Sequence, residues 1–370
     1  MYRKINLLNL FTCSIQNKKI VRTNVFFSIL FIILPFSAFA QLGGKQSFSF
    51  LNIAPNARIL GLGGVNLTAD SKDIGMFFSN PALVDSTDGT NAQLNFFTLN
   101  AGSTYSTFAF QKRISANRFL RAGIQYLGYG SFNGFDLVGN STGSFSAQDY
   151  ALTVSYAQRI SPFTLGINLK LVGSSIANYS SFGILLDVAS AFIHPKKDLK
   201  ISLAIKNLGF AFSNYTDASQ FSMPFDAQVG ISFRPEKMPI RFSFTAHQLA
   251  PSADIVYNDP NKKGIIDANG NEIKPTVSTF DKLSRRMVFG AEVIVSKNFN
   301  IRFGYNFLRR KELSEEVRRA LVGFSFGFMF RVKEMEFSYA RSIQHLSGGL
   351  NCFSIALNTN SLIKKKKIVE

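Results

Sequence analysis

Apolar residues recur at every second position in one segment after another, and this pattern constrains the fold more than any other feature of the chain. In one segment, Val322, Phe324, Phe326, Phe328 and Phe330 alternate with glycine, serine or methionine. Successive side chains of a β-strand point to opposite faces, so the alternation predicts strands with one apolar face. A strand of a soluble β-sandwich gives the same pattern, which leaves two fold classes open.

The lengths of the gaps between these segments distinguish the two fold classes. The alternation predicts about fourteen strands, at residues 91–100, 104–113, 118–129, 148–159, 163–173, 179–193, 198–208, 223–234, 239–248, 286–296, 298–308, 319–330, 333–341 and 350–358. Apart from the short first gap, at 101–103, the gaps are alternately short and long. Bacterial outer-membrane barrels have an even number of antiparallel strands, with tight turns on one side of the membrane and longer loops on the other. The sequence therefore predicts an all-β, multi-pass outer-membrane barrel whose long loops, above all 130–147 and 249–285, face outside.

Composition favours a barrel over membrane helices. The chain has 39 Phe and no Trp, and its mean hydropathy is only +0.09. No stretch after residue 40 approaches the roughly 20 apolar residues of a membrane helix. In a barrel only every second residue faces lipid, which accounts for the low hydropathy.

The first 40 residues are predicted to be a signal peptide. Basic residues precede an apolar run at 25–36, and Ala38 and Ala40 frame a small-x-small cleavage site. Cleavage is therefore expected between Ala40 and Gln41. A signal anchor is the alternative, but the apolar run is shorter than a membrane span. The long basic segment leaves the position of the start codon open.

The remaining chain divides into three predicted parts. Residues 41–90 break the strand pattern and are expected to form a plug inside or under the barrel. Residues 91–360 form the barrel, and residues 361–370 form a basic tail that is either solvated or in contact with anionic headgroups. The plug motif comprises Asn80, Pro81 and Ala82.

The chain is strongly basic, with 41 Lys and Arg against 23 Asp and Glu. Such a balance can indicate nucleic-acid binding, but these cations are dispersed over strands and turns, and a secreted barrel does not meet nucleic acid. The expected anionic partner is lipopolysaccharide or another outer-membrane lipid. The mature chain keeps only Cys352, which excludes an internal disulfide and a cysteine metal site.

Charges of both signs fall on the inward face of the predicted strands. The predicted lumen charges are Arg121, Lys170, Lys206, Asp226, Arg241, Glu292, Arg302 and Glu336. They are expected either to form ion pairs around a plug or to be solvated independently. An open pore lined by one sign of charge is not favoured.

No catalytic, cofactor or metal site is predicted. His194, His247 and His345 lack metal-ligand spacing, and no serine lies in a G-x-S-x-G context. The glycines at 61–64 resemble a phosphate loop but lack its third glycine, so close backbone packing is the favoured interpretation. We expect a protein that is not an enzyme.

The two longest predicted loops are the best candidates for binding a partner, since long loops are often functional. Asp267 and Asn269 resemble the start of a calcium loop, but Glu272 stands where its glycine should follow. A polar external loop is the favoured interpretation. The candidate partner-binding residues are Phe132, Asp136, Tyr257, Asp259 and Asp267.

Segments spread over nearly the whole mature chain carry a resemblance to a known family. They include PFDAQVGI at 224–231 and IRFSFTAHQL at 240–249, together with 149–152, 179–183, 288–292, 296–302, 309–313, 324–328 and 337–341. These segments resemble the PorQ family of the Bacteroidetes type IX secretion system. The plug motif also resembles the wider FadL-like barrel group, which includes PorV and PorP.

The resemblance implies a fourteen-stranded FadL-like barrel in the attachment complex of that system. A PorQ-like protein would be a non-catalytic anchor that tethers a PorZ-like surface protein beside PorV- and PorU-like components. That complex sorts cargo and attaches it to lipopolysaccharide. The chain departs from the family pattern at 315–319 and 364–367, so no contacts are implied there.

Transport of small hydrophobic molecules, as in FadL itself, is the alternative function. It needs a continuous apolar pocket in the lumen and an opening in the wall. A lumen filled with charged and polar side chains would argue against it. An outer-membrane enzyme that hydrolyses lipid is the third possibility.

Overall fold

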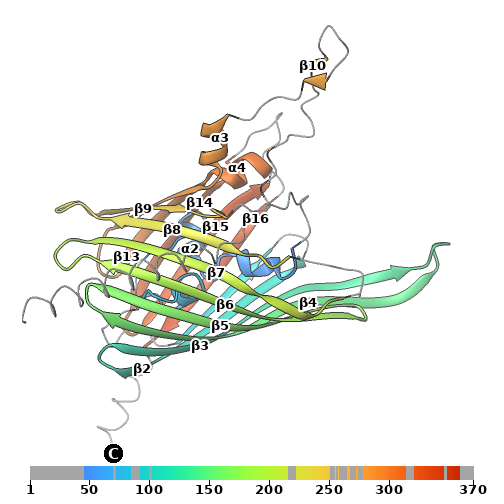
Figure 1. The fold of residues 1–370 in the computed structure, drawn as a ribbon, viewed down its shortest axis with the longest axis horizontal. Coiled ribbons are helices and arrows are strands. Elements are labelled where there is room, and N and C mark those ends of the chain that lie inside the picture. The colour runs from blue at the N-terminus through green and yellow to red at the C-terminus, as the bar shows by residue number, and fades with distance from the viewer. Residues whose placement is uncertain are drawn as a thin grey trace, which may run out of the picture. The chain divides into compact units, whose positions relative to one another are not determined.

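Fourteen antiparallel strands close into a barrel in the part of the chain that the structure describes (Figure 1). The structure is a computed structural model, and it describes residues 46–69, 72–84, 92–99, 102–215, 222–250, 255, 257, 265–266, 272–273, 278–313, 321–345 and 348–358. The predicted all-β barrel is therefore confirmed. The predicted signal peptide with Ala40 and Gln41, and the tail at 361–370, lie outside the described residues.

Each predicted segment contains one strand of the wall. The strands are β1 Ala92–Thr98, β2 Thr104–Ser115, β3 Arg118–Phe135, β4 Ser141–Ile160, β5 Phe163–Ile176, β6 Tyr179–Ile193, β7 Leu199–Ser213, β8 Asp226–Phe233, β9 Ile240–Ala246, β12 Met287–Ile294, β13 Phe299–Asn306, β14 Phe324–Val332, β15 Met335–His345 and β16 Gly348–Leu357. Neighbours along the chain pair, except that β9 pairs with β12, and β1 closes the barrel against β16.

The β3–β4 hairpin corrects the prediction of a loop at 130–147. Both strands continue into that segment, and their pairing runs as far as Phe135 and Ser141. Most of the segment is glycine, serine and other polar residues, exposed on both faces, so it lacks the apolar alternation that marks the wall. It is a two-stranded ribbon that continues beyond the neighbouring strands (Figure 1).

Two of the other long segments between strands contain short helices. The 249–285 region holds β10 Ile265–Ile266, β11 Glu272–Ile273 and helix α3 Thr279–Ser284. Helix α4, Phe307–Leu313, follows β13 directly, so that strand ends two residues before its predicted end. No helix among the described residues is long and apolar enough to cross a membrane.

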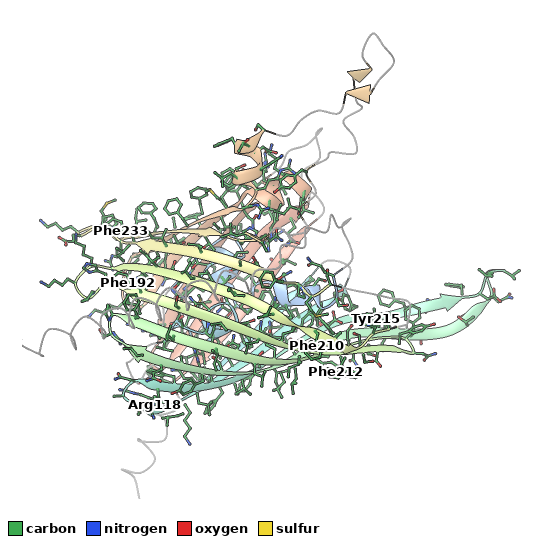
Figure 2. All side chains as sticks on the ribbon, viewed as in Figure 1. Arg118, Phe192, Phe210, Phe212, Tyr215 and Phe233 are labelled. Atoms are coloured by element: carbon green, nitrogen blue, oxygen red, sulfur yellow. The ribbon has the colours of Figure 1, made fainter. Side chains whose placement is uncertain are left out.

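The outer face of the barrel is apolar, and the inner face carries the polar residues. On β5, for example, Leu165, Ile167, Leu169 and Leu171 are each about half exposed, whereas Lys170 is buried. Aromatic residues lie toward both ends of the strands: Figure 2 shows Phe192 and Phe233 at one end and Phe210 and Phe212 at the other. An outward apolar band flanked by aromatic residues on a closed barrel defines a transmembrane β-barrel of the outer-membrane type.

The segment before β1 fills the inside of the barrel. It contains the 3₁₀ helix η1 Ser49–Asn52, helix α2 Ala57–Gly61 and the 3₁₀ helix η2 Ile74–Phe78. Asn56 caps α2 by accepting from the backbone N–H of Ile59 at 2.9 Å, which satisfies one of the unpaired donors of the first turn. Helix α2 is completely buried, and it packs against β13, β14, β15 and β16. We call residues 46–84 the plug.

Candidate functional site: the plugged lumen and the external rim

Glycines in the wall allow the plug to lie directly on the barrel backbone. A Cβ added at Gly304 would lie 2.1 Å from the backbone nitrogen of Gly63, and one added at Gly166 would lie 2.2 Å from the backbone carbonyl carbon of Pro81. No side chain fits at such distances. Gly63 belongs to the glycine run at 61–64, which agrees with close backbone packing and not with a phosphate loop.

The predicted plug motif holds the end of the plug against the wall. The Asn80 amide donates to the backbone oxygen of Leu67 at 2.7 Å, and its oxygen accepts from the Ala82 N–H at 2.9 Å. The guanidinium of Arg121, on β3, donates to the backbone oxygen of Pro81. Arg121, a predicted lumen charge, thus binds plug backbone, and it has no acidic partner among the described residues.

Arg58, in the plug helix α2, is the centre of a buried set of ion pairs. Its Nη1 lies 2.7 Å from Glu292 Oε1, its Nε 3.2 Å from Asp73 Oδ2, and its Nη2 3.6 Å from Glu336 Oε1. All four side chains are nearly or completely buried. Arg58 therefore joins two strands of the wall, β12 and β15, to the plug.

Glu292 also binds the strands on either side of its own. It accepts from Arg302 Nε on β13 at 3.0 Å and from Arg241 Nη1 on β9 at 3.1 Å. The set is completed by the pairs Arg241–Asp198 at 2.8 Å and Arg331–Glu336 at 2.7 Å. We call these four cations and four carboxylates the ionic network; its members are Arg58, Asp73, Asp198, Arg241, Glu292, Arg302, Arg331 and Glu336.

The other predicted lumen charges lie among β5–β8. Lys170 Nζ is 2.7 Å from Asp187 Oδ2 and 2.8 Å from Asn207 Oδ1. Lys206 and Asp226 stand opposite each other in the β7–β8 register, and both are buried. The eight predicted charges thus divide between the ionic network, this second group and Arg121.

Sequence reasoning missed Arg58, Asp73 and Asp187. Arg58 lies in an apolar run, and a buried charge there requires a partner. An arginine within an apolar segment could therefore have identified Arg58 as a buried, paired charge. The alternation of β6 places Asp187 on the inward face, so the rule that identified Lys170 could have found its partner as well.

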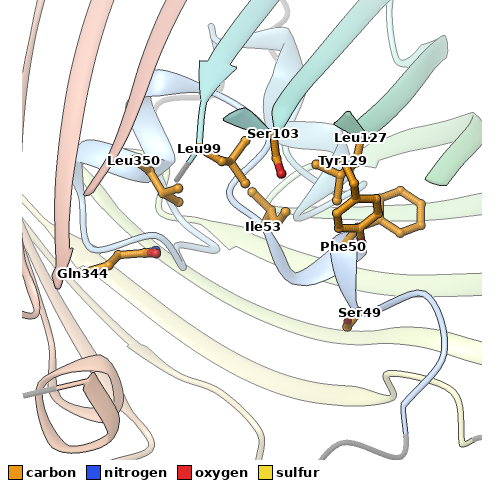
Figure 3. A pocket seen from close by; sticks show the side chains of 9 residues that line it. All are labelled: Ser49, Phe50, Ile53, Leu99, Ser103, Leu127, Tyr129, Gln344 and Leu350. Atoms are coloured by element: carbon orange, nitrogen blue, oxygen red, sulfur yellow. The ribbon is translucent and has the colours of Figure 1, made fainter. Parts of the chain in front are cut away.

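A cavity of about 300 Å³ lies between the plug and the outer ends of the wall strands (Figure 3). It is lined by Ser49, Phe50, Ile53, Leu99, Ser103, Leu127, Tyr129, Gln344 and Leu350. Most of these side chains are apolar. The volume is at the lower end of the range for small-molecule sites.

The wall is incompletely paired beside β7. Residues 199–206 of β7 pair with β8, whereas the part at 208–213 pairs with β6 alone among the described strands. Leu208, Phe210 and Phe212 in the latter part are more than half exposed. Strand β7 therefore continues beyond the residue where β8 begins.

Two candidate partner-binding residues lie on the β3–β4 ribbon. Phe132 stacks on Phe145 across the two strands, with ring centroids 5.5 Å apart, and both rings are exposed. Both carboxylate oxygens of Asp136 are used within the tip, where they accept from Val138 and Asn140. Phe132 is thus available to a partner, whereas Asp136 shapes the turn.

Tyr257 lies against a basic rim formed by α3 and α4. The Lys282 ammonium and the Arg285 guanidinium lie 5.9 and 5.5 Å from its ring centroid. Within the rim, Arg309 is partly buried, and desolvation lowers its pKa to about 10. Asp259 and Asp267 lie outside the described residues.

The fold and the lumen define a plugged transmembrane β-barrel. No protein-family model matches the chain. No curated protein matches it either.

Among solved structures, the P. putida toluene transporter TodX is 11% identical, with 83% of this chain and 96% of that chain covered at a TM-score of 0.47. A Pseudomonas aeruginosa FadL homologue is 10% identical, with 82% and 98% covered at a TM-score of 0.46. The KdgM porin is 6% identical, with 72% and 98% covered at a TM-score of 0.32.

Proposed function

We propose that this barrel is a non-catalytic outer-membrane anchor that holds a surface protein through its external ribbon. The observation that carries the proposal is the β3–β4 ribbon, which extends beyond the wall and ends in an exposed apolar tip. Phe135, Leu137 and Val138 at that tip are 64%, 107% and 86% exposed. Such a cluster on a protruding element is a frequent mark of a protein-binding site.

The ribbon offers a partner both side chains and backbone. On the side of the ribbon tip, β3 has no pairing with β2 after Gly128, and β4 has no pairing with β5 before Ala147. Residues 130–135 and 141–145 therefore pair only with each other among the described strands, so each outer edge can accept a partner strand. The stacked Phe132 and Phe145 rings supply an aromatic contact of the kind enriched in interfaces.

The filled lumen supports an anchor over an open channel. The ionic network and the buried Lys170–Asp187 pair occupy the inside, and the plug lies on the wall backbone. The resemblance to the PorQ family supplies the finer proposal, in which the tethered protein is PorZ-like and PorV- and PorU-like components assemble beside it.

A pull-down from outer membranes with the tagged barrel tests this function. Leu137→Asp combined with Val138→Asp should abolish recovery of the surface partner, because a carboxylate disfavours an apolar contact. Val295→Asp, at an exposed turn at the other end of the barrel, is the matched control. Folded barrels resist SDS until heated, so gel mobility reports assembly of each variant. Recovery that is equal for the tip variant and its parent contradicts the proposal.

Transport of a small apolar molecule is the second candidate, and the cavity together with the part of β7 that lacks pairing with β8 favours it. A cavity of 150 Å³ can hold benzene, so about 300 Å³ is enough for one aromatic ring with substituents. Toluene binding that is lost in Leu350→Phe and unaffected by the tip variant would support it.

A further inference from the structure

We propose that the basic rim formed by α3 and α4 binds a phosphate-bearing lipid of the outer leaflet. Residues 278–286 and 307–313 contain six Lys and Arg against two acidic residues. Two of the cations, Arg285 and Lys311, share one carboxylate: Asp281 Oδ2 is 2.7 Å from Arg285 Nη2, and Asp281 Oδ1 is 3.0 Å from Lys311 Nζ. Such an excess of positive charge attracts anions.

The cations differ in the direction they face. Arg309 is directed inward, where its Nη1 donates to Ser342 Oγ at 3.2 Å. Lys282 is exposed, and the Lys311 side chain is 50% exposed. These two lysines and Arg285, gathered around Asp281, form the part of the rim that an external anion can reach.

Exposed apolar side chains accompany these cations. On α3, Phe280 is 79% exposed and Leu283 is 52% exposed, on either side of Lys282. A short segment that presents large apolar groups together with lysine matches the composition of elements that lie in a membrane interface. A free phosphate would account for the lysines but not for the apolar residues.

The rim is continuous with the lipid-facing wall. Phe307, the first residue of α4, packs edge-on against Tyr305 at 4.6 Å and Phe289 at 5.5 Å between ring centroids. Phe289 in turn packs against Phe244, a 46% exposed residue of the outer face. Because the long loops belong to the external side, the rim lies where the headgroups of the outer leaflet meet the apolar band. This continuity selects a lipid as the occupant.

Native mass spectrometry of the purified barrel with bis-phosphorylated lipid A tests the site. Lys282→Gln combined with Lys311→Gln should weaken lipid retention about thirtyfold, since each cation near a membrane surface contributes about 1 kcal/mol. Lys196→Gln with Lys197→Gln, in the exposed β6–β7 turn at the other end, removes the same charge and should leave retention unchanged. Both pairs are surface residues, so the heat-dependent gel shift should be retained.

Two further probes identify which chemical groups of the lipid the rim recognises. The parent barrel should retain dephosphorylated lipid A as weakly as the double variant retains phosphorylated lipid A. Inorganic phosphate should not displace lipid A from the parent barrel. Equal retention by the double variant and its control overturns the site. Retention without phosphate groups would show a purely apolar contact, and displacement by inorganic phosphate would show a free-anion site; either result also overturns the proposal.

Discussion

The two sides of the barrel wall are built differently. The tall wall, β3–β7, has strands of 14 to 20 residues, whereas the short wall, β8, β9 and β12–β14, has strands of 7 to 9 residues. A membrane-spanning strand needs about 9–11 residues. The short wall therefore has fewer interstrand hydrogen bonds than the tall wall, and all of its strands except β14 are shorter than that length.

Different side chains hold the two walls together. The outer face of the tall wall is mainly Leu, Ile and Val between its ends, whereas β9, β13 and β14 present Phe at most outward positions. Inside, the ionic network joins β9, β12 and β13 to the plug through Glu292, and it joins β14 and β15 to the plug through Glu336. The comparison teaches that where strand pairing is short, side-chain contacts on both faces of the wall take over part of its role.

The largest expected effect is on the ionic network. Glu292→Gln would leave Arg58, Arg241 and Arg302 without their shared carboxylate, and breaking a buried ion pair costs about 3–5 kcal/mol. Asp187→Asn on the tall wall removes one partner of Lys170 and should lie at the lower end of that range. Urea unfolding in detergent measures both free energies. A larger loss for Asp187→Asn would mean that the short wall does not depend on its network.

The contact between plug and short wall should give the next largest effect. Gly304→Ala places a Cβ where the Gly63 backbone lies, so the plug must shift. Cys352 is completely buried beside Ser354, whose hydroxyl accepts from the plug backbone at Ala57. Maleimide labelling of Cys352 in the folded mature barrel should therefore become several times faster. Gly128→Ala, where an added Cβ would make only ordinary van der Waals contacts, is the control. Unchanged labelling would mean that the plug can leave this wall without exposing β16.

The sequence predicted the walls far better than what connects them. Alternation identified every wall strand because lipid on one face and polar contacts on the other impose a period of two. It did not identify the ribbon at 130–147, where neither face is buried and no period is imposed. It found Glu292 and Glu336 as inward charges, but their common partner Arg58 lies in a non-periodic segment. Pairing across more than 200 residues of chain requires the fold.

A smaller effect is expected on the aromatic outer face. The ring centroids of Phe324 on β14 and Tyr305 on β13 are 4.7 Å apart. Such an aromatic pair contributes about 0.5–1.5 kcal/mol to stability beyond the burial of its surface. Phe324→Leu should therefore lower the free energy of unfolding by about 1 kcal/mol. Ile167→Leu on the tall wall keeps an aliphatic surface and should change it by less than about 0.5 kcal/mol. Equal losses would show that aromatic pairs have no special role on the short wall.

The smallest expected effect is a pH dependence of stability. It distinguishes the ribbon tip, at the end of the tall wall, from the basic rim, at the end of the short wall. Burial raises the pKa of Asp281 at the rim, but hydrogen bonds from Lys311 and Arg285 outweigh it, so the net pKa lies below the ordinary 3.8. At the ribbon tip, the Asn140 backbone N–H and then its side chain lower the pKa of Asp136. A depressed pKa in the folded state means that each contribution to stability is complete above pH 3.8 and is lost as the pH falls through the folded value.

Salt should separate the two carboxylates, since it screens the cations around Asp281 but not the hydrogen bonds to Asp136. We expect ¹³C NMR titrations to show the Asp281 pKa rising toward its ordinary value in high salt and in Lys311→Gln. The Asp136 pKa should not move in either case. If the two pKa values responded to salt alike, the rim would not be held by charge. The ends of the tall and short walls would then share one kind of support, unlike the walls themselves.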